Sequence, residues 1–206
     1  ADQNKGMSDL WRRLRFVFMA IVVYRLGTHI PIPGIDPARL AALFDQNQGT
    51  ILEMFNLFSG GALERMSIFA LNVVPYISAA IIMQLFSNSI PYLQELKKDG
   101  QAGRNQITQY TRYGTVVLAF VQASALAVTL GASGLAYEPG TSFFISAVFS
   151  VVAGTIFLMW LGELITERGI GNGISIIIAT SILTGIPGAI GQALEQARQG
   201  DLNIFL

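Results

Sequence analysis

The chain alternates between long apolar blocks and short polar stretches. The apolar blocks run over residues 14–30, 73–91, 113–130, 143–165 and 173–191. A helix that crosses a bilayer needs about 20 mostly apolar residues, and in lipid each segment must satisfy its own backbone polar groups. The pattern therefore predicts an all-α fold, a polytopic transmembrane helical bundle whose polar links lie in water.

The polar stretches differ in basic residues, which are retained in the cytoplasm when they flank a membrane helix. Most basic side chains lie before or at the start of the first block and in the second link: Arg12, Arg13, Arg15, Lys97, Lys98, Arg104 and Arg112. The expected cytoplasmic segments are 1–13, 92–112 and 166–172. The expected outer segments are 31–55, 131–142 and 192–206, the last of which also begins a sixth helix.

Composition supports a membrane protein and argues against an enzyme. Of the residues, 52% are hydrophobic and 13% are charged, against roughly 25% charged in soluble domains. The chain has no cysteine and a single histidine, His29, so it offers no thiolate nucleophile or zinc cluster. The helices also lack the paired carboxylates of an aspartyl protease and the serine–histidine pair of a serine protease. We expect no catalytic activity, no metal and no cofactor.

The run Gly169–Gly173 is rich in glycine but does not predict a nucleotide site. No strand precedes it, and no Lys-Ser/Thr pair follows to complete a phosphate-binding loop. We expect a tight turn between the fourth and fifth blocks, with Asn172 capping the helix that follows.

The segment at 56–70 is too apolar for a plain outer loop and too short to span a bilayer. It leads to Pro75, so we expect a short helix that abuts the second spanning helix at a break. Broken helices at membrane depth usually line cavities. An amphipathic helix on the outer surface is the alternative.

Two rows of apolar residues recur every fourth position on the second and fifth blocks. Their members are Val73, Ile77 and Ile81, and Ile174, Ile178, Ile182, Ile186 and Ile190. Such rows are ordinarily lipid or core contacts, and a hydrophobic pore constriction is the alternative.

Phe157 is expected to face lipid. For Arg25 the pattern favours a side chain that extends to the outer headgroups over a functional role.

Several motifs together resemble the SecY family of protein-conducting channels. They are Pro31–Asp36 (PIPGID), Phe58–Leu63 (FSGGAL), Ser67–Leu71 (SIFAL), Pro75–Ala79 (PYISA), Gln109–Gly114 (QYTRYG) and Trp160–Ser175 (WLGELITERGIGNGIS). The resemblance runs in family order from about Arg12 to Leu206. It corresponds to the amino-terminal half of the channel, helices one to five plus the start of helix six, and thus to one half of an inverted repeat.

The resemblance implies roles that spacing leaves open. It implies a hydrophobic pore ring with the members Val73, Ile77, Ile174 and Ile178. It implies a plug helix at 56–70, hinged at its glycines, that includes Asn56, Leu57, Phe58, Ser59, Gly60, Gly61, Ala62, Leu63, Glu64 and Arg65. It implies a lateral gate, open to lipid, that includes Ser78, Ile81 and Gln84.

The function implied by the resemblance is passive conduction of unfolded secretory polypeptides across the bacterial cytoplasmic membrane, with lateral release of membrane segments into lipid. The implied partners are SecE, SecG, the SecA motor, the ribosome, signal sequences and nascent polypeptides. Two residues depart from the family pattern: Asn72 replaces a common glycine, and Val73 replaces a ring isoleucine, which predicts a slightly leakier resting pore. Half of a solute transporter and a structural assembly subunit are the rival interpretations.

Overall fold

The fold is built from helices, as the apolar blocks predict. A computed structural model describes residues 3–46, 56, 59–138 and 140–199. Among these residues the elements are α1 (Gln3–Gly27), α2 (Pro37–Gln46), α4 (Val74–Ser89), α5 (Pro91–Lys98), α6 (Gly100–Ala132), α7 (Thr141–Arg168) and α8 (Gly173–Gln199). The predicted all-α fold is confirmed. The expected start of a sixth helix falls partly on residues 200–206, outside the described residues.

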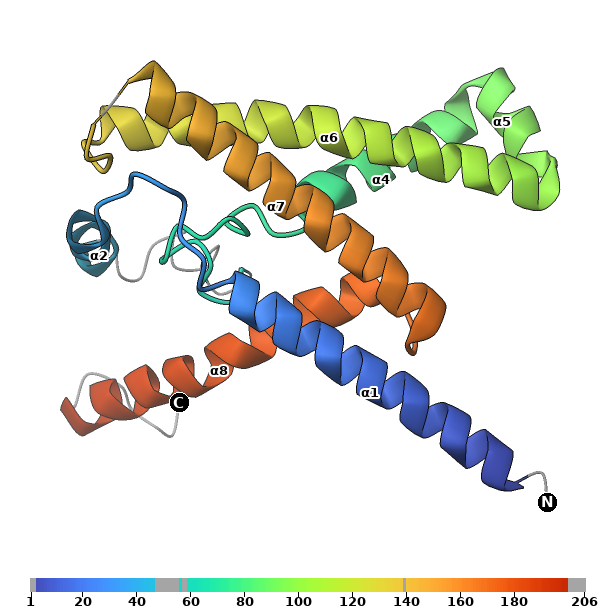
Figure 1. The fold of residues 1–206 in the computed structure, drawn as a ribbon, viewed down its shortest axis with the longest axis horizontal. Coiled ribbons are helices and arrows are strands. Elements are labelled where there is room, and N and C mark those ends of the chain that lie inside the picture. The colour runs from blue at the N-terminus through green and yellow to red at the C-terminus, as the bar shows by residue number, and fades with distance from the viewer. Residues whose placement is uncertain (1–2, 47–55, 57–58, 139, 200–206) are drawn as a thin grey trace.

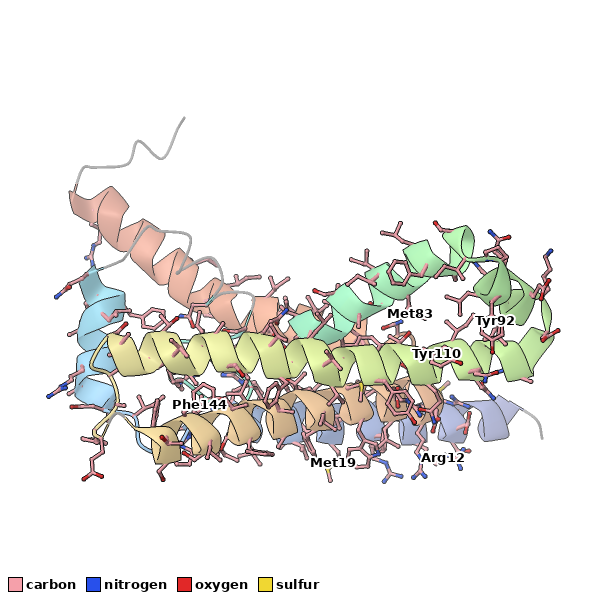
Figure 2. All side chains as sticks on the ribbon, turned by 90° about the horizontal axis from the view of Figure 1, so that it is seen from above. Arg12, Met19, Met83, Tyr92, Tyr110 and Phe144 are labelled. Atoms are coloured by element: carbon pink, nitrogen blue, oxygen red, sulfur yellow. The ribbon has the colours of Figure 1, made fainter. Side chains whose placement is uncertain are left out.

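The link at 92–112 is helical, so the prediction of a loop there was wrong. It consists of α5 and the first turns of α6. Polarity showed that the segment meets water, but it did not fix the backbone conformation. The two helices pack tightly because Gly103 lies against the carbonyl of Leu96, where a Cβ would come within 1.6 Å of the oxygen. Figure 2 shows Tyr92 of α5 and Tyr110 of α6 near one another where these helices meet.

Two of the described helices, α6 and α7, are long and apolar enough to cross a membrane, and in α8 the apolar stretch Gly173–Gly188 is shorter. The α4 helix has 16 residues, or about 24 Å at 1.5 Å per residue, which is less than a hydrocarbon core of about 30 Å. Crossings by α1, α4 and α8 stay predictions.

The helices alternate in direction, so that the expected cytoplasmic ends lie together. In Figure 1 the start of α1, the α5 helix and the start of α6 lie toward one end of the molecule, whereas α2 and the α6–α7 link lie at the other. The Arg13 guanidinium donates to the carbonyl of Gly169, at 3.2 Å, which ties the start of α1 to the turn after α7. The two basic stretches thus share one end of the fold.

The first hydrophobic core lies between α6 and α7 and extends under the outer connection. Small residues form its centre, with Ala123, Ala127 and Ala147 buried beside Val151. Small side chains let membrane helices approach closely. The α6–α7 seam, as we call this contact, is the most regular packing in the fold.

Two backbone hydrogen bonds hold the start of the expected outer connection. The Ile32 amide donates to Met66 and the Ile68 amide to Ile30, which pairs this connection with the end of the predicted plug. The sequence pattern did not predict α2. That helix begins after Asp36, whose carboxylate accepts from the Ala38 amide at 2.9 Å, an N-terminal cap followed by proline at the first helical position.

Candidate functional site

The four predicted ring residues lie in one hydrophobic cluster. Val73 precedes α4 and is only 2% exposed. Ile77 lies one turn later on α4, and Ile174 and Ile178 lie on the first turns of α8, all three half-buried against the same cluster. Two helices that are far apart in sequence therefore bring this set together.

The segment that covers this cluster is a series of turns rather than the predicted helix. Asn56 is helical, Leu57 and Phe58 lie outside the described residues, and 59–66 form successive turns. The reason is local: Gly60 and Gly61 have φ angles of 64° and 79°, in the left-handed region that a right-handed helix cannot include. The prediction of a helix over 56–70 was wrong for its described part from Ser59 onward.

The turns are stabilised by bonds within the segment. The Ser59 hydroxyl donates to the carbonyl of Asn56 at 2.9 Å and accepts from the Leu63 amide at 3.1 Å. The Asn56 side chain pairs with Glu64, accepting from its amide and donating to its carboxylate. Arg65 folds back on the carbonyl of Gly61. The segment is thus a compact unit of turns held by its own side-chain and backbone hydrogen bonds.

Ala62 and Phe69 are the residues of this segment that are buried in the cluster. Ala62 is fully buried beside the ring residues. Phe69 lies between the Tyr24 ring of α1 and the Phe157 ring of α7, with centroids 6.0 and 5.9 Å away and nearly parallel planes. Trp160 continues the row. The expectation that Phe157 faces lipid was wrong, because this α7 ring stacks on Phe69 of the turns at 59–70, which we call the plug segment after their predicted role.

A glycine in α7 allows the backbone of this segment to come close to the helix. Gly154 lies against Ile68, and a Cβ on Gly154 would come within 2.1 Å of the Ile68 carbonyl oxygen. A side chain there would displace the backbone of the segment. This glycine therefore sets how deeply Phe69 enters the cluster.

Polar contacts from α1 hold the other side of the segment. The Tyr24 hydroxyl lies 3.3 Å from the carbonyl of Ser59, and the Arg25 guanidinium donates to the carbonyl of Gly60 at 3.0 Å. The favoured expectation that Arg25 extends away to the headgroups was wrong. Its half-buried side chain binds the plug segment instead. Figure 1 shows α1 and α8 crossing beside this segment.

Ser181 of α8 completes this polar contact. Its hydroxyl is hydrogen-bonded to Tyr24 and accepts from the Asn72 amide group at 3.3 Å. Asn72 has a φ of 49°, a left-handed conformation that glycine and asparagine adopt more readily than other residues. The departure from glycine at this position is therefore compatible with the backbone.

The predicted gate residues lie on α4. Ser78 is half-buried, whereas Ile81, at 52% exposure, and Gln84 are exposed. Other large apolar side chains are exposed on this helix: Val74, Ile82, Leu85 and Phe86. Gln84 also lines a cavity of about 390 Å³ between α4, α5 and α6, beside Lys97 and Arg104. The α4 helix thus presents an apolar face with no covering element among the described residues.

Sequence reasoning missed an ion pair between α6 and α7. The Arg112 guanidinium donates two hydrogen bonds of 2.8 Å to the two carboxylate oxygens of Glu163. From sequence, Arg112 was assigned to the link at 92–112, and Glu163 was included only within the motif Trp160–Ser175. Opposite charges at the same expected end of adjacent helices were the signal that could have paired them. Asn172 was predicted correctly, because its side chain accepts from the Ser175 amide at the start of α8.

Residues 67–206 match the family model described as SecY. The chain belongs to the SecY family. It is 63% identical to protein translocase subunit SecY of Pseudomonas aeruginosa, over 100% of this chain and 46% of that protein. It is 58% identical to protein translocase subunit SecY of Escherichia coli K12, over 98% and 46%. The chain thus spans about half the length of these SecY relatives.

The solved structures show the same fold. A structure described as Sec61 in the canine ribosome–channel complex from the endoplasmic reticulum has a TM-score of 0.65 at 20% identity, over 95% of this chain and 43% of that one. A structure described as that of a protein conducting channel matches equally well. Another, whose title concerns the plug domain of SecY, has a TM-score of 0.60 at 22% identity, over 95% and 42%. The predicted membership and helical channel fold are confirmed.

Proposed function

We propose that residues 1–206 form the amino-terminal half of a channel that passively conducts unfolded polypeptides across the bacterial cytoplasmic membrane. The observation that carries the proposal is that Val73, Ile77, Ile174 and Ile178 lie in one hydrophobic cluster beneath the turns at 59–70. Two helices supply the apolar side chains, and a separate compact segment covers them. That is the arrangement expected of a pore constriction with a plug.

The chemistry of the constriction suits a passage that does not read sequence. Ile and Val side chains offer a passing polypeptide neither charge nor hydrogen bonds, so they do not retain any one segment. An apolar constriction also opposes the passage of water and ions when the pore is empty. The half-buried positions of Ile77, Ile174 and Ile178 leave part of each side chain available to a translocating chain once the plug segment is displaced.

The exposed face of α4 supports a lateral exit. Ile81 and Leu85 lie on this face, with Ser78 and Gln84 supplying polar groups nearby. We propose that this face meets the second half of the channel when the gate is closed and lipid when it is open. Signal sequences and membrane segments would leave the pore along it.

The basic residues and the family membership also bear on the orientation and the partners of this half of the channel. The basic stretches at one end of the fold support a cytoplasmic amino terminus, because Lys and Arg favour that side. The named relatives are translocase subunits, which supports assembly with SecE and SecG. The driving force would come from the SecA motor or the ribosome, and the channel itself would not be an enzyme.

The test is site-specific crosslinking in the complete channel. Single cysteines replace Ile77, Ile178 or Phe149, and each is crosslinked to a secretory polypeptide arrested midway. Phe149 is the control because its α7 side chain is 66% exposed and lies outside the hydrophobic cluster around the ring. Residues 1–206 contain no native cysteine, so a crosslink from this half of the channel reports the one introduced position.

We expect strong crosslinks from Ile77 and Ile178 and none from Phe149. Equal crosslinking at all three positions, or none at the ring positions, would contradict a pore ring. Uptake of a small solute in place of a polypeptide would favour the transporter interpretation.

A further inference from the structure

The hydroxyl groups of Tyr24 and Ser181, next to the plug segment, can each donate a hydrogen bond to either of two acceptors. Tyr24 can donate its single hydroxyl proton to the carbonyl of Ser59 or to the hydroxyl of Ser181. Ser181 can donate its own proton to Tyr24 or to the carbonyl of Ile177, which lies 2.9 Å away. Two arrangements therefore keep the hydrogen bond between Tyr24 and Ser181 while both hydroxyl protons have an acceptor.

In the first arrangement Ser181 donates to Tyr24, and Tyr24 donates to Ser59 of the plug segment. In the second, Tyr24 donates to Ser181, and Ser181 donates to Ile177 of its own helix. Only the first arrangement binds the plug segment. In the second arrangement both hydroxyl protons still have an acceptor after the plug segment has left. Because an unpaired buried donor is costly, this redistribution lowers the cost of releasing the segment.

We propose that Tyr24 and Ser181 form a two-position hydroxyl latch that binds the plug segment through Ser59 and redistributes its hydrogen bonds between α1 and α8 when the segment leaves. The inference rests on the proposed channel function. Asn72 donates to Ser181 in either arrangement, because the donor is its own amide group. The approach of Gly60 to Ser181, where a Cβ on Gly60 would come within 3.1 Å of the Ser181 Cα, brings Ser59 within reach of Tyr24.

The two latch residues have different roles, which makes the proposal testable. Tyr24→Phe removes the hydroxyl that donates to the carbonyl of Ser59, but it keeps the aromatic ring that stacks on Phe69. Ser181→Ala leaves Tyr24 free to donate to Ser59 and removes the acceptor that Tyr24 uses after release. Tyr24→Phe should therefore favour the released state, whereas Ser181→Ala should not.

The experiment measures resting ion conductance of the complete channel, with its partner subunits, in phospholipid vesicles. We expect Tyr24→Phe to raise the conductance roughly two- to tenfold, the factor for one neutral hydrogen bond. Arg25 still binds Gly60 in this variant, so the channel should not open fully. We expect Ser181→Ala to conduct no more than the parent, and the double variant to match Tyr24→Phe. Controls are Tyr113→Phe, at an exposed position of α6, and Ser146→Ala, whose hydroxyl bonds within α7.

Either of two results would overturn the latch. One is an unchanged conductance in Tyr24→Phe, and the other is an equal rise in Tyr24→Phe and Ser181→Ala, which would indicate simple loss of packing. Polypeptide translocation is measured in the same vesicles. Failure of translocation by the parent would contradict the proposed function, whereas a raised conductance in Tyr24→Phe alone would still support the latch as the closure of an ion path.

Discussion

The α6–α7 seam and the cluster around the plug segment are both hydrophobic, but they are built differently. In the seam, regular helices contact through buried alanines such as Ala123 and Ala127. In the plug cluster, a chain of turns contributes Ala62 and Phe69, and left-handed residues interrupt its backbone. One contact depends on close helix packing, the other on a few ring contacts and hydrogen bonds.

This difference indicates which contact can open. Separating α6 from α7 would expose a continuous strip of buried surface, whereas displacing the plug segment breaks a limited set of contacts with α1, α7 and α8. Regions with fewer regular backbone hydrogen bonds are those that open at low free energy. We therefore expect changes in the seam to alter stability, and removal of side-chain hydrogen bonds to the plug segment to alter conductance at nearly unchanged stability.

The largest effect is expected in the seam. Ala123→Leu places extra methylenes where the native side chain is buried between α6 and α7. Overpacking of this kind costs about 1–3 kcal/mol, and thermal unfolding in detergent measures it. Ala125→Leu, on an exposed face of the same helix, is the matched control. Equal melting temperatures for the two variants would contradict the importance of the seam.

A smaller stability effect is expected at Asn72, where the plug segment meets α4. Asn72→Val puts a β-branched residue at a φ of 49°, which costs roughly 1–2 kcal/mol. Asn72→Gly removes the side chain without this backbone cost and is the comparison variant. Thermal unfolding should rank the parent and the glycine variant above valine. A valine variant as stable as glycine would show that the left-handed conformation is not required.

A still smaller loss of stability is expected at the ion pair between Arg112 and Glu163, at the end of the seam. Arg112→Ala leaves Glu163 without its bidentate partner, and the two side chains are 38% and 23% exposed. Because the pair is neither fully exposed nor fully buried, we expect a loss of about 1 kcal/mol. The double variant with Glu163→Gln should recover part of the loss. A double variant that loses the sum of both single effects would rule out coupling between the pair.

The smallest effect is expected at the ring. Val73→Ile adds one methylene to the constriction and should lower the resting conductance by less than about twofold, because a fuller apolar ring opposes ions more strongly. Val73 is already nearly buried, which limits the gap that isoleucine can fill. Resting conductance against the parent is the measurement, and an unchanged value would remove the ring-size argument.

Much of the fold could be predicted from the sequence, because apolar blocks of sufficient length have few alternatives to helices. The boundaries of α7 follow its block closely. The link at 92–112 could not be assigned, since polar residues occur in exposed helices as well as in loops. No apolar pattern indicates that Gly103 packs against the carbonyl of Leu96. The Gly60–Gly61 pair did contain a signal against a helix, but it was interpreted only as a hinge.

The candidate site was less accessible to pattern alone. Apolar residues every fourth position occur on lipid-facing and pore-facing helices alike, so only the family resemblance singled out Ile77 and Ile178. The contact between Tyr24 and Ser181 joins residues on α1 and α8, and no spacing rule connects them. Phe157 was assigned to lipid because the direction of a ring on an apolar helix depends on its neighbours in space.

The central claim is that the plug segment closes the apolar constriction and leaves it when a polypeptide passes. The most direct measurement is alkylation of a single cysteine at Ala62, which is fully buried in the cluster, in the complete channel at rest and with an arrested polypeptide. Glu64→Cys, on the exposed side of the same segment, is the control. We predict that the cysteine at Ala62 is protected at rest and reacts when the polypeptide is engaged. Equal reactivity in the two states would contradict the account.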